Sequence, residues 1–458
     1  TICDAVLQAG VNYKNTVEPR IDRLVKNYPE AKTSSTFATL IKKEGIVLSL
    51  SERKNKISST LSKEASRFHA SVVLNEQLLE EVANIVERPA VICCDFASRF
   101  LKLPEIVLLA SMAKYQRVFA LYDGNNNIIN KFMAVVENRP TNSAGIKKHY
   151  EFVLNARLQD AEFFFHEDTK EPLDKNLDKL KGIILHKQLG DLFSKTQRMM
   201  VMADQIASAL GFSPEKNKKL VRAAELSKAD LLTKMVYEFP SLEGAMGSVY
   251  ARLKGQDSEV ADGLAEHYKP RSNEDTLPKT ELGALLSLID KAYNIIGLLG
   301  VGVMPSGSVD PFTIRRQVQA VIRILIDYRL ELSIRKVFDI CYEPMKGILS
   351  QNREDILNTF LTLSKERFCY LMREDNMPQD LITAVAEVNF DIPYEVFLRI
   401  KILNSIYKSQ ELFCAAKVVE RSANIIKTEA AFEPSSFKES LLCENEEKKL
   451  YKAYIENK

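Results

Sequence analysis

The change in hydrophobic pattern near residue 140 limits the possible folds more than any other feature of this 458-residue sequence. Before that point, residues 90–96 and 128–138 are short apolar, β-rich runs that predict strands. After it, no convincing alternating run appears, and apolar residues recur at helical spacing, as in 214–238 and 279–299. The sequence therefore predicts a small α+β module followed by a larger all-α body, in a chain that is mainly α and multi-domain.

Capping residues, prolines and short apolar runs predict the positions of several helices and strands. Asn75 is expected to cap a helix that ends before Pro89, residues 103–116 predict a second helix, and residues 117–123 a strand. Further along, Ser213 followed by Pro214 is a helix start signal. The other predicted helices are 146–165, 175–211, 241–254, 309–328, 331–348, 353–373, 377–388, 392–408 and 410–427.

Composition and motifs exclude several classes of protein. Hydrophobic residues make up 46% and charged residues 27% of the chain, which is typical of a globular protein. The net charge is only +2, so any nucleic-acid site has to be local. No apolar run reaches the roughly 18 residues of a membrane span, so no membrane partner is expected. No Walker loop, GxGxxG, HExxH or GxSxG motif occurs, and no ATP-using active site or catalytic residue is recognisable.

The seven cysteines form no CxxC pair, which favours reduced thiols and a cytoplasmic protein. Cys93 and Cys94 are neighbours in a predicted strand, so one side chain is expected on each face. No signal peptide is visible. The start at Thr1 and the charged final stretch suggest a fragment of a longer chain.

Three acidic or imidazole side chains in or near apolar helices are candidates for a polar centre. Asp230 needs a partner, because an unpaired buried charge is costly; it is either a ligand or pairs with Lys228 or Lys234. Asp230, His267 and Asp290 together resemble parts of a metal-phosphohydrolase site, although a lone histidine is more often a satisfied core residue. The sequence leaves both interpretations open.

Two further groups of residues suit a nucleic-acid ligand. Asp310 and Pro311 open a predicted helix whose second turn carries Arg315 and Arg316, which either bind phosphate or form a solvated face. In helix 415–427, a polar stripe consists of Lys417, Arg421 and Asn424. The opposite side, expected to pack on the domain core, consists of Val418, Val419, Ser422, Ile425 and Ile426.

Several segments, in order, resemble the beta subunit of the bacterial-type heterotetrameric glycyl-tRNA synthetase. They include AEFFF (161–165), EFPSLEGAMG (238–247) and PSGSVDPFTIRR (305–316), and the resemblance extends from about Gly45 to Tyr451. It implies the non-catalytic part of a glycine–tRNA ligase, whose alpha subunit or fused alpha region carries the glycine and ATP (with Mg) chemistry. The implied partners are that alpha part and tRNA(Gly), in a heterotetramer or a fused dimer; no cofactor is expected on this chain.

The resemblance also implies a domain organisation. It divides the chain into a connecting segment (1–64), an editing-like α+β module (65–145), a connecting helix (146–174), an HD-like helical domain (175–330) and a C-terminally truncated anticodon-binding domain (331–458). On this basis, Lys228, Lys291, Arg315 and Arg316 are candidates for the acceptor side of the tRNA. The candidates for the anticodon are Lys417, Arg421 and Asn424.

The HD-like domain departs from the HD signature. Where that signature has His-Asp, this chain has Ala229 and Asp230, so a metal site here lacks one ligand. We therefore expect vestigial HD positions at Ala229, Asp230, His267 and Asp290, with no metal. The alternatives are a metal-dependent HD phosphohydrolase and a helical scaffold that binds only protein.

Overall fold

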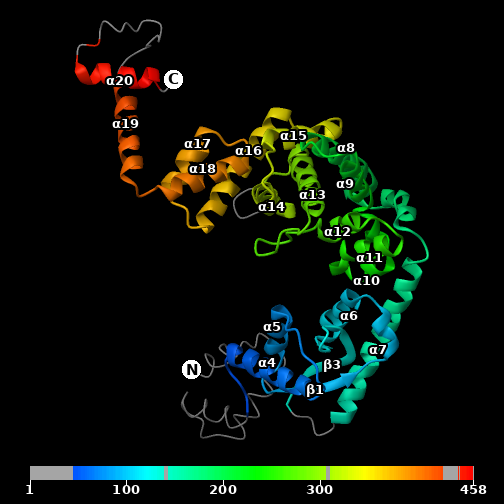
Figure 1. The fold of residues 1–458 in the computed structure, drawn as a ribbon. Helices are drawn as coiled ribbons and strands as arrows, with labels where there is room; N and C mark the ends of the chain where they lie inside the picture. Colours follow the sequence, from blue (N-terminus) through cyan, green and yellow to red (C-terminus); the bar gives the residue numbers. More distant parts are fainter. Residues whose placement is uncertain (1–44, 139–142, 306–309, 427–441, 443, 457–458) are drawn as a thin grey trace. The chain divides into compact units, whose positions relative to one another are not determined.

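The computed structural model describes residues 45–138, 143–305, 310–426, 442 and 444–456. These residues form two compact units, one comprising residues up to 368 with 391–394, the other 369–390 with the residues from 395 onward. The described part is mainly helical with few strands, as the sequence predicts (Figure 1). Of the expected connecting segment 1–64, residues 1–44 lie outside the described residues.

The α+β module is a three-stranded antiparallel sheet with helices on both faces (Figure 1). The strand order is β1-β3-β2. The elements are α4 (Leu50–Ser66), α5 (Glu76–Ile85), β1 (Pro89–Asp95), a 3-10 turn (Ser98–Lys102), α6 (Glu105–Ser111), a π-helical turn (Met112–Gln116), β2 (Phe119–Tyr122) and β3 (Ile128–Glu137). The predicted strands are confirmed, whereas the helix predicted over 103–116 is shorter and ends in the π turn.

Alternation along the strands separates the two faces. Met133 on β3 belongs to the core under α4 and α5, whereas Phe132 belongs to the core on the other face. Their partners across β1 are Cys93 and Cys94, so the two thiols lie on opposite faces as expected. Asn75 caps α5 by accepting a hydrogen bond from the Leu78 backbone N at 2.9 Å.

A second group of elements forms the helical body of the first unit (Figure 1). It contains α7 (Ser143–Asp168), 3-10 turns (Leu173–Asn176, Asp178–Gly182), β4 (Ile184–His186), β5 (Gly190–Asp191), α8 (Leu192–Ala209), α9 (Pro214–Leu226), a 3-10 turn (Ala229–Leu232), α10 (Lys234–Glu238), a 3-10 turn (Pro240–Leu242), α11 (Ala245–Leu253), α12 (Ser258–Glu266), α13 (Glu281–Gly300), a 3-10 turn (Pro311–Thr313), α14 (Ile314–Asp327), α15 (Ile334–Tyr342) and a 3-10 turn (Glu343–Met345). α13 is long and apolar enough for a membrane span by composition, but 94% of its apolar window is buried within the protein, as in a core helix.

Two long helices predicted here are wrong, and the short α12 was not predicted. The helix expected over 175–211 is interrupted by the β4–β5 hairpin, where Gly190 has a φ of +88° that a helix does not allow. The helix expected over 214–238 begins as predicted, with Ser213 as its cap, but α9 ends at Leu226. The chain then turns so that Lys228 and Asp230 enter the interior.

The sheet and the helical body share one hydrophobic core, which includes Phe132 of β3 and Tyr250 of α11. Polar contacts also join the α+β module to the helical body. The Tyr115 hydroxyl donates to the Glu238 side chain at 2.8 Å, although the two residues are 123 positions apart. The Asp168 carboxylate, at the end of α7, accepts hydrogen bonds from the backbone N–H of Lys234 and Met235 at 2.9 Å each. α7 is thereby fixed to the start of α10.

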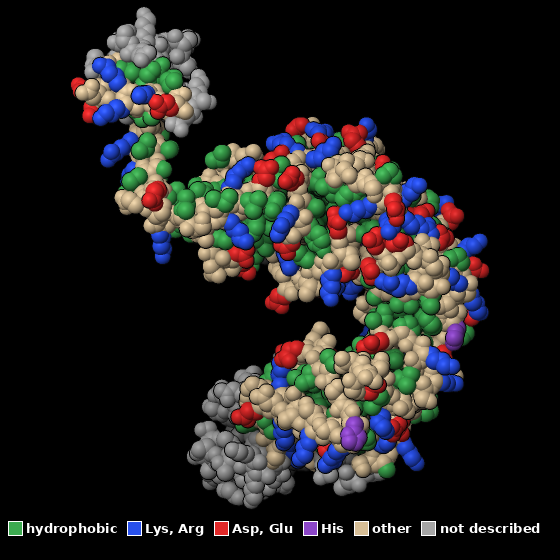
Figure 2. All heavy atoms as spheres, viewed as in Figure 1, with side chains coloured by type: hydrophobic (Ala, Val, Ile, Leu, Met, Phe, Trp, Pro, Cys, Tyr) green, Lys and Arg blue, Asp and Glu red, His purple; other side chains and the backbone are tan. Residues whose placement is uncertain are grey.

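All described secondary-structure elements of the second unit are helices. Helix α16 (Arg353–Glu374) passes from the first unit into the second, which continues with α17 (Gln379–Val388), α18 (Pro393–Ser405), α19 (Gln410–Ile426) and α20 (Asn445–Glu456). Figure 2 shows basic and acidic side chains interspersed over the visible face of the first unit's helical body, in keeping with the small net charge.

Candidate functional site

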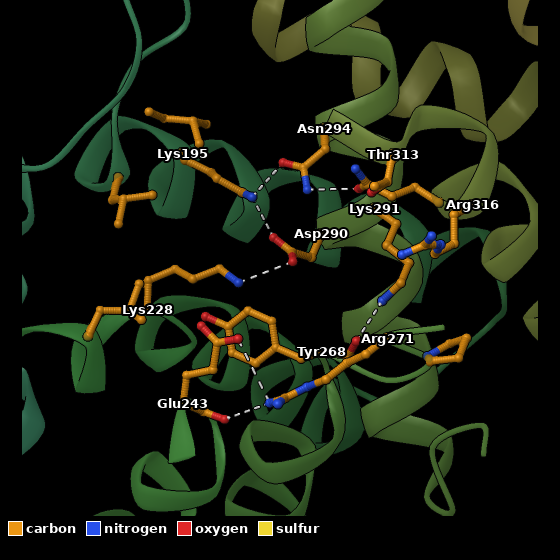
Figure 3. Close-up of a pocket in the computed structure, with 15 residues that line it drawn as sticks. Lys195, Lys228, Glu243, Tyr268, Arg271, Asp290, Lys291, Asn294, Thr313 and Arg316 are labelled. Atoms are coloured by element: carbon orange, nitrogen blue, oxygen red, sulfur yellow. Dashed lines mark hydrogen bonds and ion pairs between the residues drawn. The ribbon is translucent and has the colours of Figure 1, made fainter. Parts of the chain in front are cut away.

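Asp290 of α13 is the centre of a buried cluster of charged groups (Figure 3). One carboxylate oxygen lies 2.6 Å from the Lys195 ammonium and the other lies 3.1 Å from the Lys228 ammonium. The three side chains are only 7%, 4% and 3% exposed, respectively. One carboxylate therefore neutralises part of the charge of two buried cations.

Each lysine has one further polar acceptor. Lys195 donates to Asn294 Oδ1 at 2.7 Å, and Asn294 in turn donates to Gln317 of α14 at 2.9 Å. Lys228 lies 3.0 Å from His267 Nε2. Because an ammonium group only donates, Nε2 accepts, and the Nδ1 proton is donated to the Leu264 carbonyl at 2.8 Å.

Burial and charge together set the protonation states. Burial alone would raise the pKa of Asp290, but the charges of Lys195 and Lys228 outweigh it and lower that pKa well below its usual range. Burial lowers the pKa of Lys195 to about 8, against the attraction of Asp290. Burial and the Lys228 charge hold the pKa of His267 well below its ordinary value, so the imidazole is neutral at pH 7. His267 is thus a satisfied core histidine.

Asp230 has different partners from those the sequence suggested. Its Oδ2 accepts hydrogen bonds from the backbone N–H of Gly244 at 2.6 Å and of Gly247 at 3.1 Å, just before and in the first turn of α11. Neither Lys228 nor Lys234 pairs with it. Burial raises the pKa of Asp230 to about 6, although these two amides favour the charged form. The lysine pairing, one of the two interpretations that the sequence left open for Asp230, is therefore wrong: the carboxylate fixes the start of a helix.

The four positions expected to correspond to the HD signature are only partly brought together. Lys228 connects His267 to Asp290, whereas Asp230 faces the two glycine amides and Ala229 is fully buried in the hydrophobic core. Within the described ranges, no group of three or more His, Cys, Asp or Glu side chains is arranged to hold a metal ion. Each oxygen of the Asp290 carboxylate instead faces a lysine ammonium group.

A pocket of about 510 Å3 opens beside this cluster and is called the lysine pocket below. Its cations are Lys195, Lys228, Arg271, Lys291 and Arg316, and its acids are Glu243 and Asp290 (Figure 3). Part of its wall is apolar and consists of Leu185, Leu192, Leu231 and Pro270. The structure thus brings Lys228, Lys291 and Arg316, three of the four acceptor-side candidates, to one place.

The acceptor-side candidates differ in the hydrogen bonds that they make within the protein. Lys291 is 6% exposed and donates to neutral acceptors, namely the Lys269 carbonyl at 3.0 Å and the Ser287 hydroxyl at 2.8 Å. Burial lowers its pKa to about 8. Arg316 is exposed, and its guanidinium makes no hydrogen bond or ion pair with another described residue. Arg315 does not line the lysine pocket, and its backbone N–H is capped by Asp310 at 3.2 Å.

The sequence did not indicate two residues of the pocket, Lys195 and Arg271. Lys195 lies on the buried stripe of α8 with Leu192, Met199 and Met202, and a lysine at a core position is a signal that could have identified it. Arg271 follows α12 and donates to the Glu243 carbonyl at 3.2 Å; no local pattern distinguishes it from other surface arginines.

The basic stripe of α19 is exposed as expected, but its opposite face is not packed. Lys417 pairs with Glu420 at 2.7 Å, and both side chains are about half exposed. Val418 and Val419 are 63% and 67% exposed, so the expectation that they pack on a core is wrong. No described helix covers them. The side chains of Ile425 and Ile426 lie outside the described residues.

Comparisons with known proteins identify the family. Residues 8–387 match the family described as "Glycyl-tRNA synthetase beta subunit". The chain is 34% identical over 425 residues to the "Glycine--tRNA ligase beta subunit" of Neisseria meningitidis, an alignment covering 92% of this chain and 60% of that protein. It is 32% identical over 455 residues to the protein of the same name from Dictyoglomus thermophilum, covering 98% and 65%. It is 36% identical over 376 residues to that of Geotalea daltonii, covering 82% and 54%.

The match places the chain in a family of aminoacyl-tRNA synthetase subunits. The chain belongs to the glycyl-tRNA synthetase beta subunit family. It spans about 60% of the length of the curated relatives that it matches.

Proposed function

We propose that this chain is the tRNA-binding, non-catalytic part of a glycine–tRNA ligase, holding tRNA(Gly) while an alpha part performs ATP-dependent glycylation. The family match over residues 8–387 carries this proposal. The alpha part, a separate subunit or a fused region, uses ATP and Mg, and the assembly is a cytoplasmic heterotetramer or fused dimer.

Glycylation of tRNA(Gly) tests this proposal. The chain alone, the alpha part alone and the two together are compared, and only the combination is expected to charge tRNA. Glycine-dependent pyrophosphate exchange by this chain alone would contradict the proposal, because it requires an active site that we assign to the alpha part.

In this proposal, residues 175–330 are an HD-like domain that binds no metal, and residues 331–458 are an anticodon-binding domain. The engagement of Asp290 by Lys195 and Lys228 supports the first part, since a metal ion would have to displace two ammonium groups. Elemental analysis is expected to find no stoichiometric transition metal and assays no phosphatase activity. One metal per chain together with phosphatase activity would favour the HD phosphohydrolase instead.

Acceptor-side contacts are proposed for Lys228, Lys291, Arg315 and Arg316, and anticodon contacts for Lys417, Arg421 and Asn424. A gel-shift assay with tRNA at increasing salt separates this function from a protein-binding scaffold, because phosphate contacts make affinity fall steeply with salt. Binding that does not change with salt, or no binding, would favour the scaffold.

A further inference from the structure

The lysine pocket has more positive charge than its own acids neutralise. Five cationic side chains line it against two carboxylates. Asp290 is shared between Lys195 and Lys228, and Glu243 lies 3.9 Å from Arg271. The pocket therefore has a formal excess of three positive charges.

Two of the cations have no acidic partner in the described part of the chain. Lys291 is bonded to neutral acceptors alone, and the Arg316 guanidinium has no hydrogen bond or ion pair there. Lys195 has three N–H donors but makes one hydrogen bond, to Asn294, and one ion pair, with Asp290. Uncompensated charge near low-dielectric surroundings is costly, and an anion would relieve it.

The depth of the cations restricts the shape of the anion. The ammonium groups of Lys195 and Lys228 belong to side chains only 4% and 3% exposed, so a group must enter the pocket end first to approach them. A phosphodiester within a nucleic-acid chain continues on both sides and carries one charge. A phosphate monoester is terminal and carries about 1.5 to 2 negative charges at pH 7.

The rest of the pocket suits the organic part of such a ligand. Its volume of about 510 Å3 falls in the usual range for small-molecule sites. Leucine side chains and the Tyr268 ring, whose centroid lies 4.0 Å from the Lys228 ammonium, also line the pocket, while Asn294, Gln317 and Thr313 provide neutral polar groups. From this combination we propose that the lysine pocket binds the phosphate monoester group of a small organic phosphate or of an RNA 5′ end.

Binding is tested on the chain by calorimetry with inorganic phosphate, adenosine monophosphate and adenosine, and with one RNA carrying either a 5′-phosphate or a 5′-hydroxyl. Adenosine is expected not to bind. Binding of phosphate and adenosine monophosphate identifies a small-molecule source, and a preference for the phosphorylated RNA identifies an RNA end. These outcomes do not require glycylation or whole-tRNA binding, so the pocket and the proposed function can fail separately.

A substitution at the exposed rim keeps the test independent of folding. Arg316→Gln removes the unengaged guanidinium and is expected to weaken phosphate binding about tenfold, since hydrogen bonds to charged groups are the strong ones. Arg335→Gln, at an exposed arginine of α15 that neither lines the pocket nor belongs to the proposed tRNA contacts, is the matched control and is expected to change affinity less than about twofold.

Three results would overturn the proposal. The first is absence of binding by phosphate and adenosine monophosphate at millimolar concentration, together with equal affinity for both RNAs. The second is an equal loss of affinity in Arg335→Gln and Arg316→Gln, which would indicate general surface charge. The third is tight binding of adenosine, which would indicate recognition without phosphate.

Discussion

Two lysine–carboxylate pairs in this chain have nearly the same length but different surroundings. Lys195 and Asp290 lie 2.6 Å apart in the helical body with side chains 4% and 7% exposed. Lys417 and Glu420 lie 2.7 Å apart on α19 with side chains 50% and 56% exposed. Water screens the second pair and is excluded from the first, so distance alone says little about the free energy of either pair.

The largest expected difference between the two pairs is in stability. Asp290→Asn leaves two buried ammonium groups without their counter-charge, which should lower the free energy of unfolding by about 3 to 5 kcal/mol. Glu420→Gln removes one partner of an exposed pair and should change it by less than about 1 kcal/mol. Urea unfolding of both variants checks this prediction. Similar losses in the two variants would mean that the pairs are energetically equivalent.

The next difference is in the response of stability to pH. The pKa of Lys195 is about 8 in the folded protein, whereas an exposed lysine has an ordinary pKa of 10.5. Between these pH values the unfolded chain binds more protons, so this lysine makes stability rise with pH, by up to about 1.4 kcal/mol per pH unit. The measurement is the difference in the free energy of unfolding between the parent protein and Lys195→Met at each pH. The titration of tyrosines and cysteines is common to both proteins and cancels in this difference. A flat difference from pH 8 to 10.5 would contradict the lowered pKa.

The smallest expected effect on stability belongs to the exposed stripe. Lys417→Glu with Arg421→Glu should leave the thermal melt nearly unchanged, because both side chains are exposed. In our proposal the same change weakens tRNA binding. The slope of log affinity against log salt concentration also falls in magnitude by roughly one for each phosphate that the protein no longer binds. Unchanged tRNA affinity with an unchanged melt would show that the stripe is only a solvated surface.

Sequence reasoning succeeded where the signal was local. Asn75 and Ser213 cap helices as predicted, because a capping side chain bonds to an N–H only three residues away. The alternation that separates Cys93 from Cys94 is equally local.

It failed where a residue depends on distant partners. Asp290 lies 95 positions from Lys195, so no spacing in the sequence could indicate the pair. Asp230 was recognised as needing a partner, but the partner is a pair of backbone amides supplied by a turn at Gly244 and Gly247. For Val418 and Val419 the local pattern was clear but the partner is absent from the described residues: the sequence shows an apolar face, and no described element covers it.

The contact between Tyr115 and Glu238 has a consequence for synthesis of the protein. The two residues are 123 positions apart, and a ribosome adding 5 to 20 residues per second needs about 6 to 25 s to make that length. The strands of the module are complete by Glu137, whereas Phe239, whose ring centroid lies 5.5 Å from that of Tyr115, comes much later. During translation, the nascent module therefore exposes an apolar face for seconds, and chaperones can bind it before the helical body emerges.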